Sequence, residues 1–484
     1  MNSVQALRSD ATRANLSVDF GKDAGRPIRP LHGVNSGPRN VSFVYDARPQ
    51  FVEAGFPYVR LHDIEYPFGA GNYVDIPCIF KNFDADENDP DSYNFALTDE
   101  YIRQTLSVSA KVVYRLGVSI EHAPAKLYTL PPKDFSKWAR ICEHVIRHYN
   151  EGWADGYEWG IEYWEIWNES DADSTKTWAG SQESFIEFYT VSARHLKAQF
   201  PHLKIGGCGF TGSHPDNVAQ FLRAISEKSP RVPLDFFSFH CYSCTPDKPI
   251  RIWENFRALL RETGYGNTEM ALNEWNFMGG WDRINQPIYY RAMKDHRGAC
   301  YYAAMLAAFQ TKTDLEAANY FEATPVKEFC GIFDVREMRV SIRDGASVQP
   351  TKGFYAFKAF NALYRMGTEV EVGSDHPTLE AVAATGACGD GILIANQGLL
   401  PTSLALTVKN AHGDMVVRLT DPIRTNEIIR TVKKGEETLS LTIPADGFLY
   451  VGTDLPDPVP TYDPHDFDHV SVTPQKENSD AFFN

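Results

Sequence analysis

Residues 163–169 read YWEIWNE, an aromatic and branched run that ends abruptly on an amide and a carboxylate. Bulky aromatic and branched side chains favour a buried strand, and a charge at the end of such a strand needs either a partner or a chemical role. A second run, residues 270–276, reads MALNEWN and has the same form. The two runs therefore predict two strands that each end on a carboxylate, Glu169 and Glu274.

Strand and helix segments alternate outward from this stretch. The predicted strands are 31–35, 57–63, 111–119, 163–169, 204–210, 234–242, 270–276 and 316–321. The predicted helices are 41–54, 98–110, one from 134, 181–200, 216–227, 250–262, 294–313 and 355–365. Eight repeats over about 340 residues, without a Rossmann glycine fingerprint, favour a (β/α)8 TIM barrel over a doubly wound sheet. We predict an α/β fold with a catalytic barrel over residues 30–366.

The pattern changes at about residue 367, where short alternating runs are separated by Gly, Asp and Pro. Such runs predict an accessory β-sandwich over 367–455, and we expect the early strand 14–20 to complete an edge of it. Residues 456–484 are rich in Pro and Asp, which predicts an extended tail. The polar stretch 64–97 is too long for a simple connection and is expected to form part of a binding rim.

The composition limits the classes of partner. With 47 Lys and Arg against 63 Asp and Glu, the net charge of −16 disfavours nucleic acid or an anionic membrane and favours a neutral small molecule or polymer. The N-terminus has no apolar signal region and no run approaches the roughly 20 apolar residues of a membrane span, so we expect a cytoplasmic protein. Cys241 and Cys244 form the one Cys-x-x-Cys pair in the sequence, without a second pair to complete a zinc site. Neither a metal nor a cofactor is predicted.

Polar side chains lie near the predicted ends of several strands. Because side chains alternate along a strand, Arg60 shares a face with His62, and His240 shares one with Tyr242. In a (β/α)8 barrel the C-terminal ends of all strands meet at one rim, which is where chemistry takes place in this fold. We therefore expect these four side chains to gather at the rim.

Three acidic side chains lie in or next to the fourth predicted strand: Glu162, Glu165 and Glu169. Glu165 shares a face with Glu169, and we expect Glu165 to lie deeper in the barrel, paired with a base such as Arg115. Asn168 has the wrong parity for a regular strand, so its participation requires a twist or bulge at the strand end. Glu162 precedes the strand, and position favours Glu169 over Glu162 as the reactive group.

Two carboxylates across a pocket are what glycosidic bond cleavage needs. One protonates the leaving oxygen, while the other attacks the anomeric carbon or activates water. A separation of about 5 Å defines a retaining enzyme, and one of about 6.5–9.5 Å an inverting enzyme. An isolated strand-end Glu is more often part of a structural ion pair, but the adjacent Asn168 and the opposing Glu274 favour catalysis by Glu169.

The sequence resembles the retaining barrel glycosidases, in which Trp-Asn-Glu ends the fourth strand and Glu ends the seventh. Within them it resembles glycoside hydrolase family 39, the family of β-xylosidases and α-L-iduronidases. Five segments carry the resemblance: VRLHD at 59–63, EIWNE at 165–169, TWAGS at 177–181, FSFHCY at 237–242 and LNEWN at 272–276. One departure is Ser170, which stands where family members commonly have proline.

The resemblance implies a role for each residue of the pair. Glu169 would be the acid/base and Glu274 the nucleophile, with Asn168 binding the 2-hydroxyl of the sugar. His62 and His240 would contact other hydroxyls. The acid must be protonated and the nucleophile charged at the same pH, so their surroundings must push the two pKa values apart.

Further residues follow from the same resemblance. Arg60 and Tyr242 would lie beside Glu274 and help to keep it ionised. Three tryptophans are candidate sugar platforms, with core or loop packing as the alternative for each: Trp178, Trp275 and Trp281. Of these, Trp275 is placed with the substrate-binding residues.

Taken together, these features predict a metal-independent retaining exo-glycosidase with a saccharide substrate, as a monomer or an oligomer. A β-xylosidase is the first interpretation; an α-L-arabinofuranosidase, an iduronidase-like enzyme or another exo-glycosidase of the family is the alternative. A carbohydrate-binding barrel without catalysis is the non-enzymatic alternative, and the presence of both Glu169 and Glu274 argues against it. A nicotinamide-dependent barrel reductase would need a phosphate-binding glycine loop, which the sequence lacks.

Overall fold

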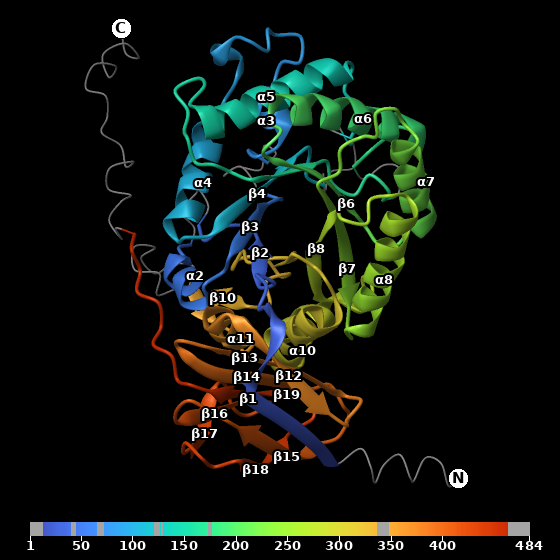
Figure 1. Cartoon of the computed structure of the whole chain (residues 1–484). Helices are drawn as coiled ribbons and strands as arrows, with labels where there is room; N and C mark the ends of the chain where they lie inside the picture. The colour runs from blue at the N-terminus through green and yellow to red at the C-terminus, as the bar shows by residue number, and fades with distance from the viewer. Residues whose placement is uncertain are drawn as a thin grey trace, which may run out of the picture.

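A computed structural model describes residues 13–39, 45–64, 72–120, 126, 129–172, 177–335 and 348–462. Its larger part is a closed barrel of parallel strands surrounded by helices (Figure 1). The barrel strands are β2 (Gly33–Asn35), β3 (Tyr58–Leu61), β4 (Lys111–Leu116), β5 (Tyr163–Ile166), β6 (Lys204–Phe210), β7 (Phe236–Ser243), β8 (Glu269–Phe277) and β9 (Ala317–Tyr320). They pair in chain order, β2 closing on β9. The predicted TIM barrel is confirmed.

Helices follow the strands around the outside of the barrel. They are α2 (Arg48–Ala54), α3 (Ile76–Ile79), α4 (Ala96–Ser107), α5 (Phe135–Glu151), α6 (Gln182–Gln199), α7 (Pro215–Ser226), α8 (Asp247–Glu262), α9 (Gln286–Lys294), α10 (His296–Lys312) and α11 (Phe354–Met366). Helix α9 was not predicted. The predicted helix 41–54 begins at Arg48, and its residues 41–44 lie outside the described part.

Helix α5 shows how local sequence sets these boundaries. The Asp134 side chain accepts hydrogen bonds from the backbone N–H groups of Ser136 (2.8 Å) and Lys137 (3.0 Å), and so caps the N-terminus. Gly152 ends the helix in the left-handed conformation, with φ of 71°. One face is buried against the barrel: Trp138, Ile141, Cys142, Val145, Ile146 and Tyr149.

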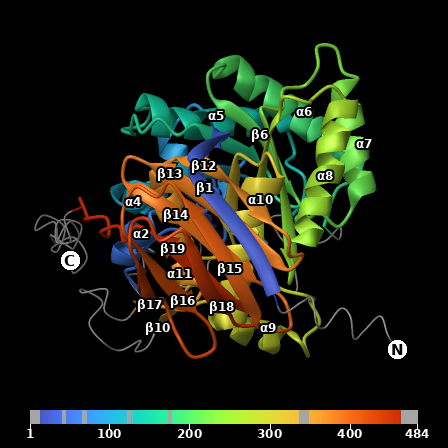
Figure 2. The same ribbon diagram turned by 60° about the horizontal axis from the view of Figure 1, so that its bottom comes forward.

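The accessory part is one mixed sheet of nine strands that curls over its own apolar core. Its strands are β1 (Arg13–Pro27), β12 (Thr368–Ser374), β13 (Leu379–Gly386), β14 (Gly389–Asn396), β15 (Thr402–Lys409), β16 (Met415–Thr420), β17 (Glu427–Val432), β18 (Thr438–Ile443) and β19 (Gly447–Gly452). Strand β1 was expected at an edge, but it lies inside the sheet, antiparallel to β12 and parallel to β15 (Figure 2). The order is β17-β16-β19-β14-β13-β12-β1-β15-β18.

Helices α10 and α11 pack between the barrel and this sheet (Figures 1 and 2). Helix α10 is buried on nearly every side and carries five alanines, whose small side chains allow the barrel strands and the sheet to approach it from opposite sides: Ala299, Ala303, Ala304, Ala307 and Ala308. A small two-stranded sheet, β10 (Phe333–Val335) with β11 (Val348–Pro350), precedes α11. The nine-stranded accessory sheet is therefore attached to the side of the barrel that carries α10 and α11.

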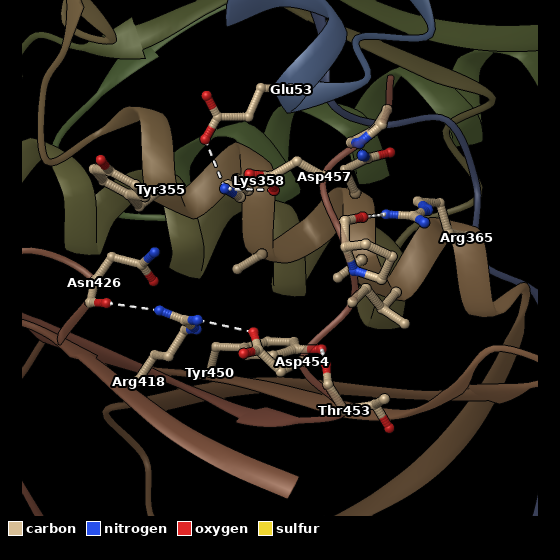
Figure 3. A pocket seen from close by; sticks show the side chains of 16 residues that line it. Glu53, Tyr355, Lys358, Arg365, Arg418, Asn426, Tyr450, Thr453, Asp454 and Asp457 are labelled. Atoms are coloured by element: carbon tan, nitrogen blue, oxygen red, sulfur yellow. Dashed lines mark hydrogen bonds and ion pairs between the residues drawn. The ribbon is translucent and has the colours of Figure 1, made fainter. Parts of the chain in front are cut away.

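The chain after β19 runs back across α11 and lines a cavity of about 270 Å3 (Figure 3). Lys358 of α11 pairs with Glu53 of α2 at 2.6 Å and with Asp457 at 2.7 Å. Arg418 of β16 pairs with Asp454 at 2.8 Å. These ion pairs connect the barrel helices, the sheet and the segment 453–458. The rest of the predicted tail, from residue 463, lies outside the described residues.

The stretch 64–97 is less irregular than predicted. It contains α3 and a 3-10 turn, Pro90–Ser92, and residues 65–71 lie outside the described part. None of its described residues from 72 onward lines the substrate cavity. The described part of the rim is formed by other loops, and the expectation for residues 65–71 lies outside the described residues. In the part of the chain with assigned structure, no helix is long and apolar enough to cross a membrane.

Candidate active site

The end of β5 leaves the regular strand conformation just before the polar residues. The strand ends at Ile166, and both Trp167 (φ 72°) and Glu169 (φ 48°) are left-handed, a conformation that non-glycine residues rarely adopt. The Glu169 N–H donates to the Gly209 carbonyl at 3.0 Å on the neighbouring β6. This irregular turn supplies the twist that the parity of Asn168 requires.

A second irregularity aligns Glu274 with β7. Phe239 pairs with Leu272, but the next residue, His240, pairs with Glu274, so Asn273 is an extra residue in β8. As a result, neighbouring side chains of β8 both reach the barrel interior. Asn273 donates to Glu165 at 2.8 Å, and Glu274 accepts from Arg60 at 2.9 Å.

Arg60 is the centre of the buried polar network. Its guanidinium donates to Glu165 Oε2 at 2.6 Å and to Glu274 Oε1 at 2.9 Å. It also donates to Asn168 Oδ1 at 2.7 Å and to Asn35 Oδ1 at 3.0 Å. One fully buried cation thereby fixes two carboxylates and the two amides, and a bidentate fork suits such a role better than an ammonium group.

His240 lies between the two candidate catalytic carboxylates. Its Nδ1 is 2.8 Å from Glu169 Oε1 and 3.5 Å from Glu274 Oε2. Because Nδ1 faces acceptors on both sides, it carries the ring hydrogen. A carboxylate oxygen of Glu169, one of Glu274 and a ring nitrogen of His240 lie within 4.8 Å of one another. The two carboxylates thus face one another across a short gap.

Burial and partners act in opposite directions on the buried acids. Burial raises the pKa of Glu274 above its ordinary value, although His240, Arg60 and the Tyr242 hydroxyl, which donates to Oε2 at 2.7 Å, all favour the charged form. Burial also opposes ionisation of Glu165, but Arg60 and Ser238 outweigh it and lower its pKa. Glu165 is therefore a fixed countercharge to Arg60.

His62 is held by residues from the neighbouring strand. Arg115 Nε donates to His62 Nδ1 at 3.2 Å, so the ring hydrogen is on Nε2, which lies 3.5 Å from Glu274 Oε1. Burial, with Arg60 and Arg115 close by, lowers the pKa of His62 well below its ordinary value. Arg115 is in turn paired with the buried Asp75. His62 is therefore a neutral ring whose Nε2–H points toward Glu274.

The carboxylates open into a cavity of about 850 Å3, a size usual for small-molecule sites. Near its floor lie His62, Glu169, Tyr242 and Glu274. Its walls come from the ends of barrel strands and from the loops and helices that follow them, and the aromatic members are Tyr242, Trp281, Tyr290, Phe321 and Phe329. The cavity is at the C-terminal rim of the barrel, where the fold predicts the site.

The structure corrects two expectations about the site. Glu165 pairs with Arg60, not with Arg115, because Arg115 is engaged by Asp75 and His62. Trp275 is fully buried behind the strand, stacked 5.9 Å from Phe357, and packs the core instead of facing the cavity. Trp178 is also in the core, whereas Trp281 lines the cavity.

Sequence reasoning missed several supporting residues. Gly209 has a φ of 58°, and a Cβ there would lie 3.0 Å from His240 Nε2 and 3.2 Å from Asn168 Oδ1. Asp171 accepts from the Thr211 N–H and hydroxyl, both at 2.9 Å, and so joins the loop after Glu169 to the loop after β6. The glycines at 206, 207 and 209 within β6 were a usable signal for close approach of neighbouring chain.

Glu169, His240 and Glu274 are also the group that could ligate a metal ion, among the residues that the structure describes. Arg60 already provides a cation 2.9 Å from Glu274, and a second positive charge beside it would be repelled. The donor set therefore fits proton transfer and nucleophilic chemistry better than it fits a divalent ion.

Fold and site together define a (β/α)8 barrel of the glycosidase type, with one carboxylate after the fourth strand and another on the seventh. The family model described as glycosyl hydrolases family 39 matches residues 42–369. The chain belongs to this family, as its motifs predicted.

Relatives with curated names are distant. A β-xylosidase from Geobacillus stearothermophilus is 25% identical over 347 residues, which cover 64% of this chain and 62% of the relative. The chain thus matches less than two thirds of the length of that protein. An α-1,4-L-rhamnosidase from Formosa agariphila is 27% identical over 123 residues, 25% of this chain and 24% of the relative.

Solved structures share the fold across most of the chain. A glucosidase from Croceicoccus marinus has a TM-score of 0.71 at 21% identity and covers 92% of this chain and 100% of its own. A family 39 β-xylosidase from Caulobacter crescentus has a TM-score of 0.66 at 16% identity, with coverage of 91% and 100%. At these identities the similarity is one of fold.

Proposed function

We propose that this protein is a retaining glycoside hydrolase that removes a terminal sugar by double displacement. The observation that carries the proposal is the short gap between Glu169 and Glu274, in which one carboxylate oxygen of each residue lies within 4.8 Å of the other. Retaining enzymes hold their carboxyl groups about 5–5.5 Å apart, whereas inverting enzymes need about 6.5–9.5 Å to place a water between them.

In the first step, Glu274 attacks the anomeric carbon while Glu169 donates its proton to the leaving glycosidic oxygen. The bond to the aglycone breaks and an ester forms between the sugar and Glu274. Glu274 must be ionised for this attack. Arg60 at 2.9 Å and the Tyr242 hydroxyl at 2.7 Å favour the carboxylate against the effect of burial.

In the second step, Glu169 takes a proton from water, and the water oxygen attacks the anomeric carbon. The ester bond to Glu274 breaks, and the sugar leaves with its original anomeric configuration. His240, hydrogen-bonded to Glu169 at 2.8 Å, holds that carboxyl group in place through both proton transfers.

A buried amide supports a sugar hydroxyl site next to Glu274. Asn168 Nδ2 is buried without a hydrogen-bond partner among the described residues, whereas His240 Nε2, also unpaired there, lies on the ring edge that faces Gly209 and not the carboxylates. An unpaired buried donor or acceptor is unfavourable, so a substrate hydroxyl that pairs with it gains affinity. Asn168 is thereby suited to the 2-hydroxyl, and the Nε2–H of His62 to another substrate oxygen.

The terminal sugar is proposed to be β-linked xylose. The Geobacillus relative and the Caulobacter structure are β-xylosidases. The Croceicoccus structure is described as a glucosidase, and the Formosa relative as a rhamnosidase. The alternative is an α-L-arabinofuranosidase or another exo-glycosidase of the family. A barrel that only binds carbohydrate is the third possibility, which the complete carboxylate pair disfavours.

A panel of aryl glycosides that differ in sugar and anomeric configuration tests activity and substrate together. We expect turnover of the β-xyloside, and turnover of a different glycoside would replace xylose with that sugar. Glu274→Ala should abolish turnover, and azide should restore it by forming a glycosyl azide of inverted configuration. Glu162→Ala is the matched control, because Glu162 is an exposed carboxylate just before β5. Unchanged activity of Glu274→Ala contradicts the proposal.

A further inference from the structure

An aromatic wall extends from the carboxylate pair to the mouth of the cavity. Phe321 lies 6.1 Å from the His62 ring and 5.8 Å from Phe329. Phe329 stacks on Trp281 at 5.8 Å with an interplanar angle of 26°. Tyr242, which hydrogen-bonds Glu274, meets Trp281 edge-on at 5.0 Å. These rings form one continuous apolar surface that runs from Tyr242, the hydrogen-bond partner of Glu274, to Trp281 at the solvent.

The outer end of this wall is unusually exposed. Trp281 is 56% exposed, although it contacts both Tyr242 and Phe329. Ile284 and Ile288, which follow Trp281 in the chain, are 84% and 55% exposed, and Val326, beside the cavity residue Lys327, is 40% exposed, but these three side chains do not line the cavity. Trp281 is therefore the large exposed apolar side chain of the cavity wall, and it joins the other aromatic residues of that wall in one apolar surface.

The direction of substrate entry places the leaving group on this surface. The inner end of the cavity is closed by the buried network of Arg60, Glu165 and Glu274. A terminal sugar must therefore enter first, with its anomeric carbon at Glu274. The group that it carries must extend outward past Glu169, and Trp281, the most exposed aromatic side chain among those that line the cavity, marks the outer part of the wall.

We propose that Trp281 and Phe329 form an aglycone site that selects an apolar leaving group, an aryl or alkyl moiety, over a further sugar. The inference rests on the proposed function and adds the class of leaving group. Two of the lysines that line the cavity are already engaged: Lys327 lies 3.3 Å from Glu322 and donates to the Asp63 carbonyl at 3.2 Å, and Lys248 donates to the Tyr242 carbonyl at 3.0 Å. The wall thus offers mainly apolar contact to a ligand.

The test compares leaving groups of similar chemistry and different apolar area. Octyl and methyl β-D-xylosides differ in chain length but have similar alkoxide leaving groups, and xylobiose supplies a sugar in the same position. We expect kcat/KM of the wild type to be about tenfold higher for the octyl than for the methyl glycoside, which corresponds to about 1.4 kcal/mol. Xylobiose should fall below the octyl glycoside.

Trp281→Ala should remove this preference, and Trp281→Phe should keep part of it. Leu399→Ala is the control, since Leu399 is 95% exposed in the loop between β14 and β15 of the accessory sheet. β-D-Xylosyl fluoride has no carbon aglycone, so Trp281→Ala should lower its turnover far less than that of the octyl glycoside. Equal turnover of octyl and methyl glycosides, or a preference for xylobiose, overturns the aglycone site while leaving the glycosidase intact.

If the proposed function is wrong, the result differs, because β-D-xylosyl fluoride and the aryl glycosides would then not be hydrolysed at all.

A second copy of this chain is the alternative occupant of the apolar cavity mouth. Sedimentation of the wild type and of Trp281→Ala tests it: a dimer that dissociates on substitution overturns the proposal, and an equal mass for both supports it.

Discussion

Tyr242→Phe tests how Glu274 is kept ionised. The substitution removes one hydroxyl, which donates to Glu274 Oε2 at 2.7 Å, and keeps the ring that packs against Trp281. A hydrogen bond to a charged group contributes about 1.5 kcal/mol. Because about 1.4 kcal/mol corresponds to one pKa unit, the pKa of Glu274, already raised by burial, should rise by about one further unit.

The nucleophile acts as a carboxylate, so activity is lost as the pH falls through the pKa of Glu274. The acid limb of the kcat/KM profile of Tyr242→Phe should therefore move upward by about one pH unit. An aryl glycoside with a good leaving group keeps the rate measurable. Tyr163→Phe is the matched control: its hydroxyl bonds the Glu269 carboxylate at 2.9 Å, at the other end of the barrel. An unmoved acid limb, or an equal shift in the control, refutes the reasoning.

Three further outcomes are expected. Glu169→Ala should lower kcat/KM about 10²–10⁴-fold for glycosides with poor leaving groups and far less for activated aryl glycosides; equal losses contradict its role as the acid. Arg115→Met leaves Asp75 buried without its cation and should lower the free energy of unfolding by about 3–5 kcal/mol, measured by urea unfolding. Burial raises the pKa of Asp75, so this loss should grow as the pH rises above the ordinary range of an aspartate and shrink as Asp75 becomes protonated; a loss independent of pH contradicts it. Lys358→Met removes two partly exposed ion pairs and should cost at most about 1 kcal/mol; a larger loss means that the segment 453–458 contributes more than its charges.

The periodic parts of the fold were predictable from the sequence. The strand 204–210 coincides with β6, and the apolar face and caps of α5 follow from local spacing alone. Catalytic candidates at strand ends were predictable for a related reason, since a charge that ends an apolar run stands out. The structure brings Glu169 and Glu274 together as that reasoning expected, through a barrel whose order follows the chain.

Partners chosen by long-range packing were not predictable. Glu165 lies beside Arg115 on the adjacent strand in register, yet Arg60, two strands away on β3, is the base that pairs with it, because Arg115 is engaged by Asp75 and His62. Trp275 is a different case, because it adjoins Glu274 and alternation alone turns it toward the helices, so its burial was predictable. Trp281 lies in an irregular loop, where no periodicity indicates which way a side chain points.

Trapping of the covalent intermediate tests the central claim most directly. A 2-deoxy-2-fluoro glycoside of the preferred sugar with a good leaving group slows the second step more than it slows ester formation, so the glycosyl-enzyme should accumulate. Mass spectrometry should find one added fluoroglycosyl unit per chain, on the peptide that contains Glu274. A label on any other residue, or an unlabelled enzyme that releases the inverted anomer, would contradict the account.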